Sequence, residues 1–232
     1  MTIKDMHYDF KKKLNKIDSQ QNKNLLIPEI DWVLNEAQEI FVKIVAFPKV
    51  YQYLGFEIGQ RTIDDIKTIV EPETCIDVNN NIVVLPGNYW FYLKGNVIMT
   101  KGKCSDVKGS LVIRQHNDDF ELSPFDDSSF EWRTVNGVFD KNGIKLFTTD
   151  FTVTKLCISF LRKLKYIHNA EEFRGGQYNL PSGQVLSGSS NCELPEHTHR
   201  EIVDIAVLIT TGELQIPDYQ IKQSKLNLNQ IK

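Results

Sequence analysis

Apolar residues recur at helical spacing most clearly between residues 28 and 47. They form a wide stripe that consists of Ile30, Val33, Leu34, Ala37, Ile40, Phe41, Ile44 and Val45. Pro28 suits the first turn of a helix, and Pro48 cannot continue one. The pattern therefore predicts a helix from Pro28 to Phe47 whose apolar face packs on another element.

Residues 1–24 are expected to form a basic helical arm. Thr2 and Asp5 have the spacing of a capping box. A thin apolar stripe follows, made of Met6, Phe10, Leu14 and Ile17. Six lysines against three aspartates give the arm a net charge of +3. Such an arm either touches DNA or presents a solvated helix face, and its thin stripe predicts that it docks on another surface.

Two more helices are expected further along the chain. A short one runs from Ile63 to Val70, with Pro72 after it. The last begins at Pro195 and ends before Gly212, and one face of it carries Ile202, Ile205, Ala206 and Ile209. Its apolar stripe is too wide for solvent, so we expect it to pack on the helix of residues 28–47.

Between Thr74 and Ile167 the pattern changes to short strands rich in β-branched and aromatic residues. Turns are expected at Asn79-Asn80-Asn81, Gly95-Asn96, Gly102, Asn117-Asp118, Asn136-Gly137 and Asn142-Gly143. The clearest strand is Thr152 to Arg162. Its alternation predicts Leu156, Ile158 and Phe160 facing the core, with Lys155 and Ser159 facing outward.

Residues 169–194 read as a long Gly-rich loop, and residues 213–232 as a polar tail. A structureless loop of this length is unusual in a compact monomer, so it is either disordered or supported by a neighbouring molecule. The tail carries scattered apolar residues at Leu214, Ile216, Tyr219, Ile221, Leu226 and Leu228. That spacing suits an extended segment laid along another protein.

Together these patterns predict an α+β fold in which helices at both ends flank a central antiparallel β-sandwich or small barrel. The expected organisation is an N-terminal helical arm and helices (1–72), a β-domain (73–168), the Gly-rich loop (169–194), a C-terminal helix that packs on the N-terminal helices (195–212) and the extended tail (213–232).

Composition narrows the function classes. The 232 residues carry a net charge of −3, which argues against a dedicated nucleic-acid binder but allows DNA to pass without sticking. The four cysteines are far apart and form no C-x-x-C pair, so we expect four reduced thiols and a reducing cytoplasm. The N-terminus has no apolar run typical of a signal peptide, and no stretch is apolar enough for a membrane helix.

The chain lacks the motifs of common enzymes. The glycines of GNYWFYLKGN are wrongly spaced for a phosphate loop, and no G-x-S-x-G elbow occurs. Asp77-Val-Asn79-Asn-Asn81 opens like a calcium loop, but Ile82 and Asn88 occupy its required glycine and glutamate positions. His197 and Glu201 share a helix face, whereas His199 diverges, so a zinc site would lack a third ligand.

Other polar and aromatic residues have ordinary interpretations. Asp118-Asp119 and Asp126-Asp127 fall in predicted loops, where water keeps both carboxylates ordinary. Trp32, Trp90 and Trp132 are core or interface anchors rather than a base-stacking platform. We therefore expect no enzymatic activity and assign no catalytic residue, no cofactor-binding residue, no metal ligand and no cofactor.

Several segments resemble a known group of proteins. MHYDFKKKLNKIDSQQNKNLLIPEIDWVLNEAQEIFVKIV (residues 6–45) and LPEHTHREIVDIAVLITTGELQIPDY (residues 194–219) resemble neck or ring structural proteins of crAss-like phages. SPFDDSSFEW and TVTKLCISFLRKLKYI, which lie between them, look like the β-region of tail adaptors in short-tailed phages. One departure is Leu164, where the adaptor pattern has a proline.

The resemblance implies a virion structural protein that forms a ring in the head-to-tail neck around the DNA channel and joins portal and tail. It implies a homo-oligomer of twelve-fold symmetry as partner, together with portal or adjacent neck and tail proteins. Double-stranded DNA would pass without specific binding, no membrane would be involved, and assembly would take place in the host bacterial cytoplasm.

Two other function classes remain open. The first is a β-sandwich that binds a ligand such as a glycan, as part of a tail fibre or baseplate. Exposed aromatics clustered on one sheet face would favour that class. The second is an enzyme with an unrecognised site, which a deep pocket with convergent polar groups would favour. A particle mass distinguishes a closed ring from a monomer or trimer.

Overall fold

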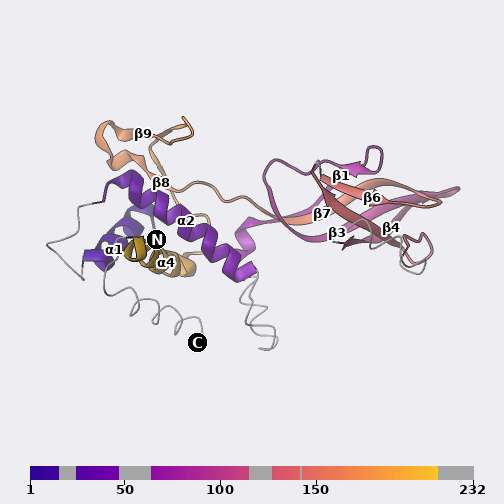
Figure 1. The fold of residues 1–232 in the computed structure, drawn as a ribbon, viewed down its shortest axis with the longest axis horizontal. Helices are drawn as coiled ribbons and strands as arrows, with labels where there is room; N and C mark the ends of the chain where they lie inside the picture. Colours follow the sequence, from indigo (N-terminus) through magenta and orange to yellow (C-terminus); the bar gives the residue numbers. More distant parts are fainter. Residues whose placement is uncertain (16–24, 47–63, 115–126, 142, 214–232) are drawn as a thin grey trace, which may run out of the picture. The chain divides into compact units, whose positions relative to one another are not determined.

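The computed structural model describes residues 1–15, 25–46, 64–114, 127–141 and 143–213 (Figure 1). The expected turn at Asn117-Asp118 and the tail beyond Glu213 lie outside these residues. Among the helices of the described ranges, none combines the length and the apolar character needed to cross a membrane.

The chain divides into two compact units. The helical unit comprises Met1–Thr68 and Leu164–Lys232, and the sheet unit comprises Ile69–Lys163. The sheet unit thus begins and ends a few residues before the β-domain of residues 73–168 expected from the strand pattern. The fold combines α-helices with a β-sheet, as the patterning predicts.

In its described residues the helical unit contains three longer helices, several 3-10 turns and two small two-stranded sheets. Its elements are α1 (Ile3–Asn15), α2 (Ile27–Ala46), β8 (His168–Asn169), η4 (Ala170–Glu172), η5 (Arg174–Gly176), β9 (Gln177–Asn179), β10 (Val185–Ser187), β11 (Ser189–Ser190), η6 (Glu196–Thr198) and α4 (His199–Glu213). The last helix therefore follows a 3-10 turn after Pro195 and includes Gly212, ending two residues beyond its expected end.

Helix α1 has the predicted capping box. The Thr2 amide donates to Asp5 Oδ2 at 2.8 Å, and the Asp5 amide donates to Thr2 Oγ1 at 3.3 Å. The side chains of Met6 and Phe10 are fully buried, and α1 packs on α4. The described part of the N-terminal segment is therefore no free arm, because its apolar residues already have partners within the helical unit.

Helix α2 packs against α4, the pairing expected from their two wide apolar stripes. The buried face of α2 includes Ile30, Leu34, Ala37 and Phe41. The short helix expected at Ile63–Val70 is different in detail: its described part leads into the 3-10 turn η2 (Lys67–Ile69), and Val70 already begins the first strand.

The Gly-rich segment is not structureless. Strand β9 pairs with β10, and β11 pairs with β8. Ala170, Tyr178 and Leu186 form a small core of their own, with Phe173 packed edge-on against Tyr178. The expectation of a disordered or neighbour-dependent loop was wrong here, because these few apolar residues fold back onto their own unit.

The sheet unit is one curled sheet of seven strands (Figure 1). The strands are β1 (Val70–Asp77), β2 (Ile82–Val83), β3 (Tyr89–Lys101), β4 (Cys104–Arg114), β5 (Thr134–Asp140), β6 (Gly143–Phe147) and β7 (Thr152–Arg162). Their order is β1-β7-β3-β4-β5-β6-β2, and β4 and β5 run parallel. The described strands thus form a single mixed sheet, where an antiparallel arrangement was expected.

Strand β7 confirms the inward face read from the sequence, whereas Ser159, which was expected to face outward, is half-buried. Leu156, Ile158 and Phe160 are buried in the core of the sheet unit, whereas Lys155 is exposed. The same core includes Val97 and Met99 from β3. The inner face of the curled sheet is therefore the hydrophobic interior of this unit.

Two expected turns lie inside strands instead. Gly95-Asn96 is part of β3, and Asn136-Gly137 is part of β5. A Cβ atom at Gly95 would lie 3.0 Å from Leu111 Cδ2, and one at Gly137 would lie 3.0 Å from Leu111 Cδ1. Both glycines therefore leave room for the same leucine side chain, which is a packing role rather than a turn role.

Other turns form where expected. Asn80 and Asn81 have positive φ angles of 52° and 60°, between the bridged residues Asn79 and Ile82. Gly102, with φ of 58°, lies in the turn between β3 and β4. These are the left-handed conformations that Asn and Gly adopt at low cost.

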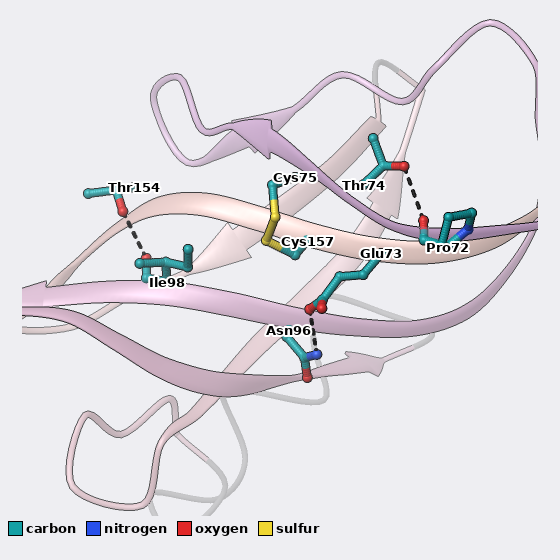
Figure 2. The surroundings of a disulfide bond; sticks show 8 residues. All are labelled: Pro72, Glu73, Thr74, Cys75, Asn96, Ile98, Thr154 and Cys157. Atoms are coloured by element: carbon teal, nitrogen blue, oxygen red, sulfur yellow. Dashed lines mark hydrogen bonds between the residues drawn. A yellow bond between two sulfur atoms is a disulfide. The ribbon is translucent and has the colours of Figure 1, made fainter.

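A disulfide joins Cys75 on β1 to Cys157 on β7 (Figure 2). The two residues are directly opposite in the register of the strands. This overturns the expectation of four reduced thiols: residues 82 positions apart in sequence become neighbours only through strand pairing. Cys104 and Cys192 are free, the first exposed and the second buried.

Candidate functional site

A buried carboxylate lies at the centre of the helical unit. Asp31, on the second turn of α2, is completely buried and accepts four hydrogen bonds. His7 Nε2 lies 2.7 Å from its Oδ1, and the Tyr178 hydroxyl donates to its Oδ2 at 2.7 Å. The Asn169 amide donates to both oxygens at 3.2 and 3.1 Å. Asp31 thereby ties α1, α2 and the Gly-rich segment together.

The surroundings of Asp31 act on Tyr178. Burial and the neighbouring carboxylate raise the pKa of the Tyr178 hydroxyl well above its ordinary value, because both disfavour a second negative charge. A carboxylate only accepts hydrogen bonds, so the hydroxyl keeps its proton and donates a hydrogen bond to Asp31. The group is therefore a fixed structural donor at neutral pH.

Polar side chains of α2 also hold an extended segment of the same unit. Asn35 Oδ1 accepts from the Ile167 amide at 2.9 Å, and Asn35 Nδ2 donates to the Ile167 carbonyl at 2.7 Å. Gln38 Nε2 donates to the Lys165 carbonyl at 3.3 Å. Asp31, Asn35 and Gln38 thus bind Asn169, Ile167 and Lys165 in turn, in an antiparallel ladder.

The ladder is possible because two spacings are similar. Positions i, i+4 and i+7 share one face of a helix and rise about 5 Å between contacts. Alternate residues of an extended chain rise about 6.6 Å. The side chains of α2 therefore serve as a substitute for the edge of a neighbouring strand.

A groove opens beside this ladder. It has a volume of about 290 Å³ and is lined by Trp32, Asn35, Glu36, Gln38, Glu39, Leu164, Lys165 and Tyr166. The Trp32 side chain remains 54% exposed. Trp32, Glu36 and Glu39 each follow a ladder residue by one position, so they have the same i, i+4, i+7 spacing. They form a second stripe on α2, and the side chains of this stripe are exposed.

The histidines of the last helix have structural partners. His197 Nε2 lies 2.7 Å from Asp65 Oδ1. The two ring nitrogens of His199 face the carbonyl oxygens of Met1 and Leu194, at 3.1 and 2.8 Å. The two rings thus diverge, as helical spacing predicts. Across the described ranges, no group of three or more His, Cys, Asp or Glu side chains is arranged to hold a metal ion.

The other motifs fall in different places. The Asp77–Asn81 segment ends β1 and forms the turn before β2. Asp118, Asp119 and Asp126 lie outside the described residues, and Asp127 is exposed. Asp77 and Asp127 belong to the sheet unit, whereas Asp31 belongs to the helical unit.

The three tryptophans are distributed over both units. Trp132 is 82% exposed and Trp90 is half-buried against Phe91, with ring centroids 4.7 Å apart. Both belong to the sheet unit, whereas Trp32 belongs to the helical unit.

The residues that organise the site were missed in the sequence. Asp31 has the position of an acid that stabilises the start of a helix, and its partners are 24 to 147 residues away. Asp31, Asn35 and Gln38 do recur at helical spacing beside the apolar stripe. That spacing alone does not separate a buried polar face from a solvated one, since Trp32, Glu36 and Glu39 share it and are exposed.

Comparisons with known proteins add no assignment. A scan against protein-family models finds no match, and a search of curated proteins finds no significant relative.

Proposed function

We propose that this chain is a structural subunit of a ring in the head-to-tail neck of a phage particle. In this proposal the ring surrounds the DNA channel, joins portal and tail, and has twelve-fold symmetry. The chain is a virion component assembled in the host cytoplasm, and it acts without catalysis.

The observation that carries this proposal is the groove on α2 with Trp32 half exposed in it. Tryptophan is strongly enriched at protein interfaces and at their energetic centres. The residues that line this groove converge on no reactive group, whereas they combine an aromatic surface with charges at the rim. That chemistry suits a protein partner.

The sequence resemblance supports the same conclusion. The segments 6–45 and 194–219 are far apart in the chain, yet the described parts of both belong to the helical unit, where α2 packs against α4. The net charge of −3 suits a wall along which DNA slides. We also interpret the curled sheet as an open half of a small barrel, since its terminal strands β1 and β2 do not pair with each other.

The test is the mass of the purified chain, measured by sedimentation and native mass spectrometry, together with negative-stain images. We expect closed rings, either of the chain alone or after the addition of portal protein. A chain that stays a monomer or trimer under both conditions would contradict the proposal.

A ligand-binding β-module is the second candidate. Tyr89, Tyr92 and Phe139 cluster on the sheet unit, with ring centroids 6.4 and 6.1 Å from Phe139, and Phe139 is exposed. Aromatic faces of this kind bind sugar rings through apolar contact. Glycan binding that is lost in Phe139→Ala, by a chain that forms no ring, would favour this candidate.

A further inference from the structure

The stripe of Trp32, Glu36 and Glu39 on α2 is left exposed by the described residues of its own unit, as are Glu29, Lys43 and Ile44. The neighbouring ladder of Asp31, Asn35 and Gln38 is occupied by residues 165–169. Glu36 has no ion-pair partner in the described part of the chain, and Glu39 has only an exposed contact with Lys43 at 3.3 Å. An exposed pair of this kind is weak and easily replaced.

The residues of the groove therefore determine which side chains an occupant must have. An occupant needs an apolar side chain to cover the indole of Trp32 and cationic groups to meet the two carboxylates. Lys165 on the opposite wall leaves the groove with one net negative charge, so an acidic occupant would be repelled.

We propose that this groove binds residues 214–232 of a second copy of the chain. The inference rests on the proposed ring and names the contact that links its subunits. The segment has three lysines against one aspartate, a net charge of +2. It also carries Ile216, Tyr219 and Ile221 ahead of Lys222 and Lys225, which places apolar side chains and cations in one short stretch.

The contact joins different surfaces on the two copies. A tail-to-groove contact is heterologous, and heterologous contacts form a ring when the rotation between neighbouring copies closes. The same segment bound to the groove of its own molecule would instead produce a monomer. Variants with reversed charges in the groove or in the tail distinguish the contact between two copies from the contact within one copy, and they keep the full-length chain.

The experiment uses two full-length variants. The first is Glu36→Lys with Glu39→Lys, and the second is Lys222→Glu with Lys225→Glu. Each alone places like charges together, so we expect each to remain monomeric by sedimentation at 0.1 M salt. Mixed in equal amounts, every groove meets a tail of opposite charge, and assembly should return. If the segment binds its own groove, mixing restores nothing and the proposal is overturned.

Trp32 provides an independent measurement. Trp32→Ala should weaken assembly at least about tenfold. A synthetic peptide of residues 214–232 should occupy the groove of the unaltered chain and so inhibit its assembly. The matched control is Trp132→Ala, which removes an exposed indole from the other unit and should change nothing. Circular dichroism checks that all variants are folded.

The outcomes also separate this inference from the proposed function. Rings that form equally well in the charge-reversal and Trp32→Ala variants would leave the ring standing and refute the tail contact. If the unaltered chain forms no ring with or without portal, the proposed function itself fails. Binding of the peptide to a groove in a chain that stays monomeric would likewise refute the ring contact.

Discussion

Asp31 shows how one buried charge organises distant parts of a chain. A carboxylate removed from water is costly unless donors surround it. His7, the Asn169 amide and Tyr178 supply these donors from three different segments. The Gly-rich segment therefore has a fixed position on α2 despite its small apolar core, because the cluster fails if any of the three segments leaves.

Tyr178→Phe tests the role of this donor. It removes the hydroxyl while it keeps the ring, so Asp31 loses one of its strong hydrogen bonds. We expect the free energy of unfolding to fall by about 2 kcal/mol, the usual worth of a hydrogen bond to a charged group. Chemical denaturation measures the change, and Tyr8→Phe, at an exposed tyrosine of the same unit, should leave it unaltered.

The same tyrosine predicts a pH dependence. Its folded-state pKa is raised, so its contribution to stability is complete below the unfolded value of about 10. Above that pH the unfolded chain releases the proton while the folded chain retains it, and stability falls. We expect the loss of stability above pH 10 to be less steep in Tyr178→Phe than in the unaltered chain.

At the scale of elements, regular hydrophobic patterns predicted helices and strands, whereas residues that interrupt these patterns were assigned to turns that do not form. The inward face of strand β7 could be predicted, because alternation depends only on adjacent residues, whereas the burial of Cys157 and Leu161 on its other face could not. Gly95 and Gly137 were read as turns, since neighbouring Asn residues suggested them. Their true role depends on Leu111, a residue from another strand, and no local pattern contains that contact.

Asn35 tests whether α2 binds residues 165–169 as a strand edge would. Asn35→Ala leaves the Ile167 amide and carbonyl without their partner. We expect a loss of about 2 kcal/mol in the free energy of unfolding, because both groups are partly buried. Glu36→Ala, one residue further along the same helix, is exposed and should be neutral.

The Cys75–Cys157 disulfide fixes the edge strand β1 onto β7 (Figure 2). Since it closes a loop of more than 80 residues, its reduction should lower the free energy of unfolding by roughly 2–4 kcal/mol. Denaturation with and without dithiothreitol measures this difference. Cys75→Ser should abolish the response, whereas Cys104→Ser, at the exposed free cysteine, should retain it.

At the scale of the whole molecule, the two units differ in whether they are continuous in sequence. The sheet unit is one continuous stretch, Ile69–Lys163, whereas the helical unit needs both ends of the chain. Sequence patterning came within a few residues of this division because the change from helical to alternating spacing marks it. That the two ends share one unit could be expected only from the matching stripes of α2 and α4.

Continuity predicts that the sheet unit folds alone. A fragment of residues 69–163 contains all seven strands, the disulfide and a core in which Val97, Met99, Leu156 and Ile158 are almost fully buried. A domain with its own core unfolds cooperatively. We therefore expect the isolated fragment to show one sharp thermal transition and a dispersed amide NMR spectrum.

The complementary fragment provides the contrast. Residues 1–68 contain α1 and α2 but lack α4, Asn169 and Tyr178, so their apolar faces lose α4 and the Asp31 carboxylate keeps only His7 of its donors. This fragment should be unfolded or molten until a second fragment, residues 164–232, is added. If residues 69–163 bind the dye ANS and melt without a cooperative transition, as molten globules do, the sheet unit depends on the helical unit and the division of the chain is not a division of stability.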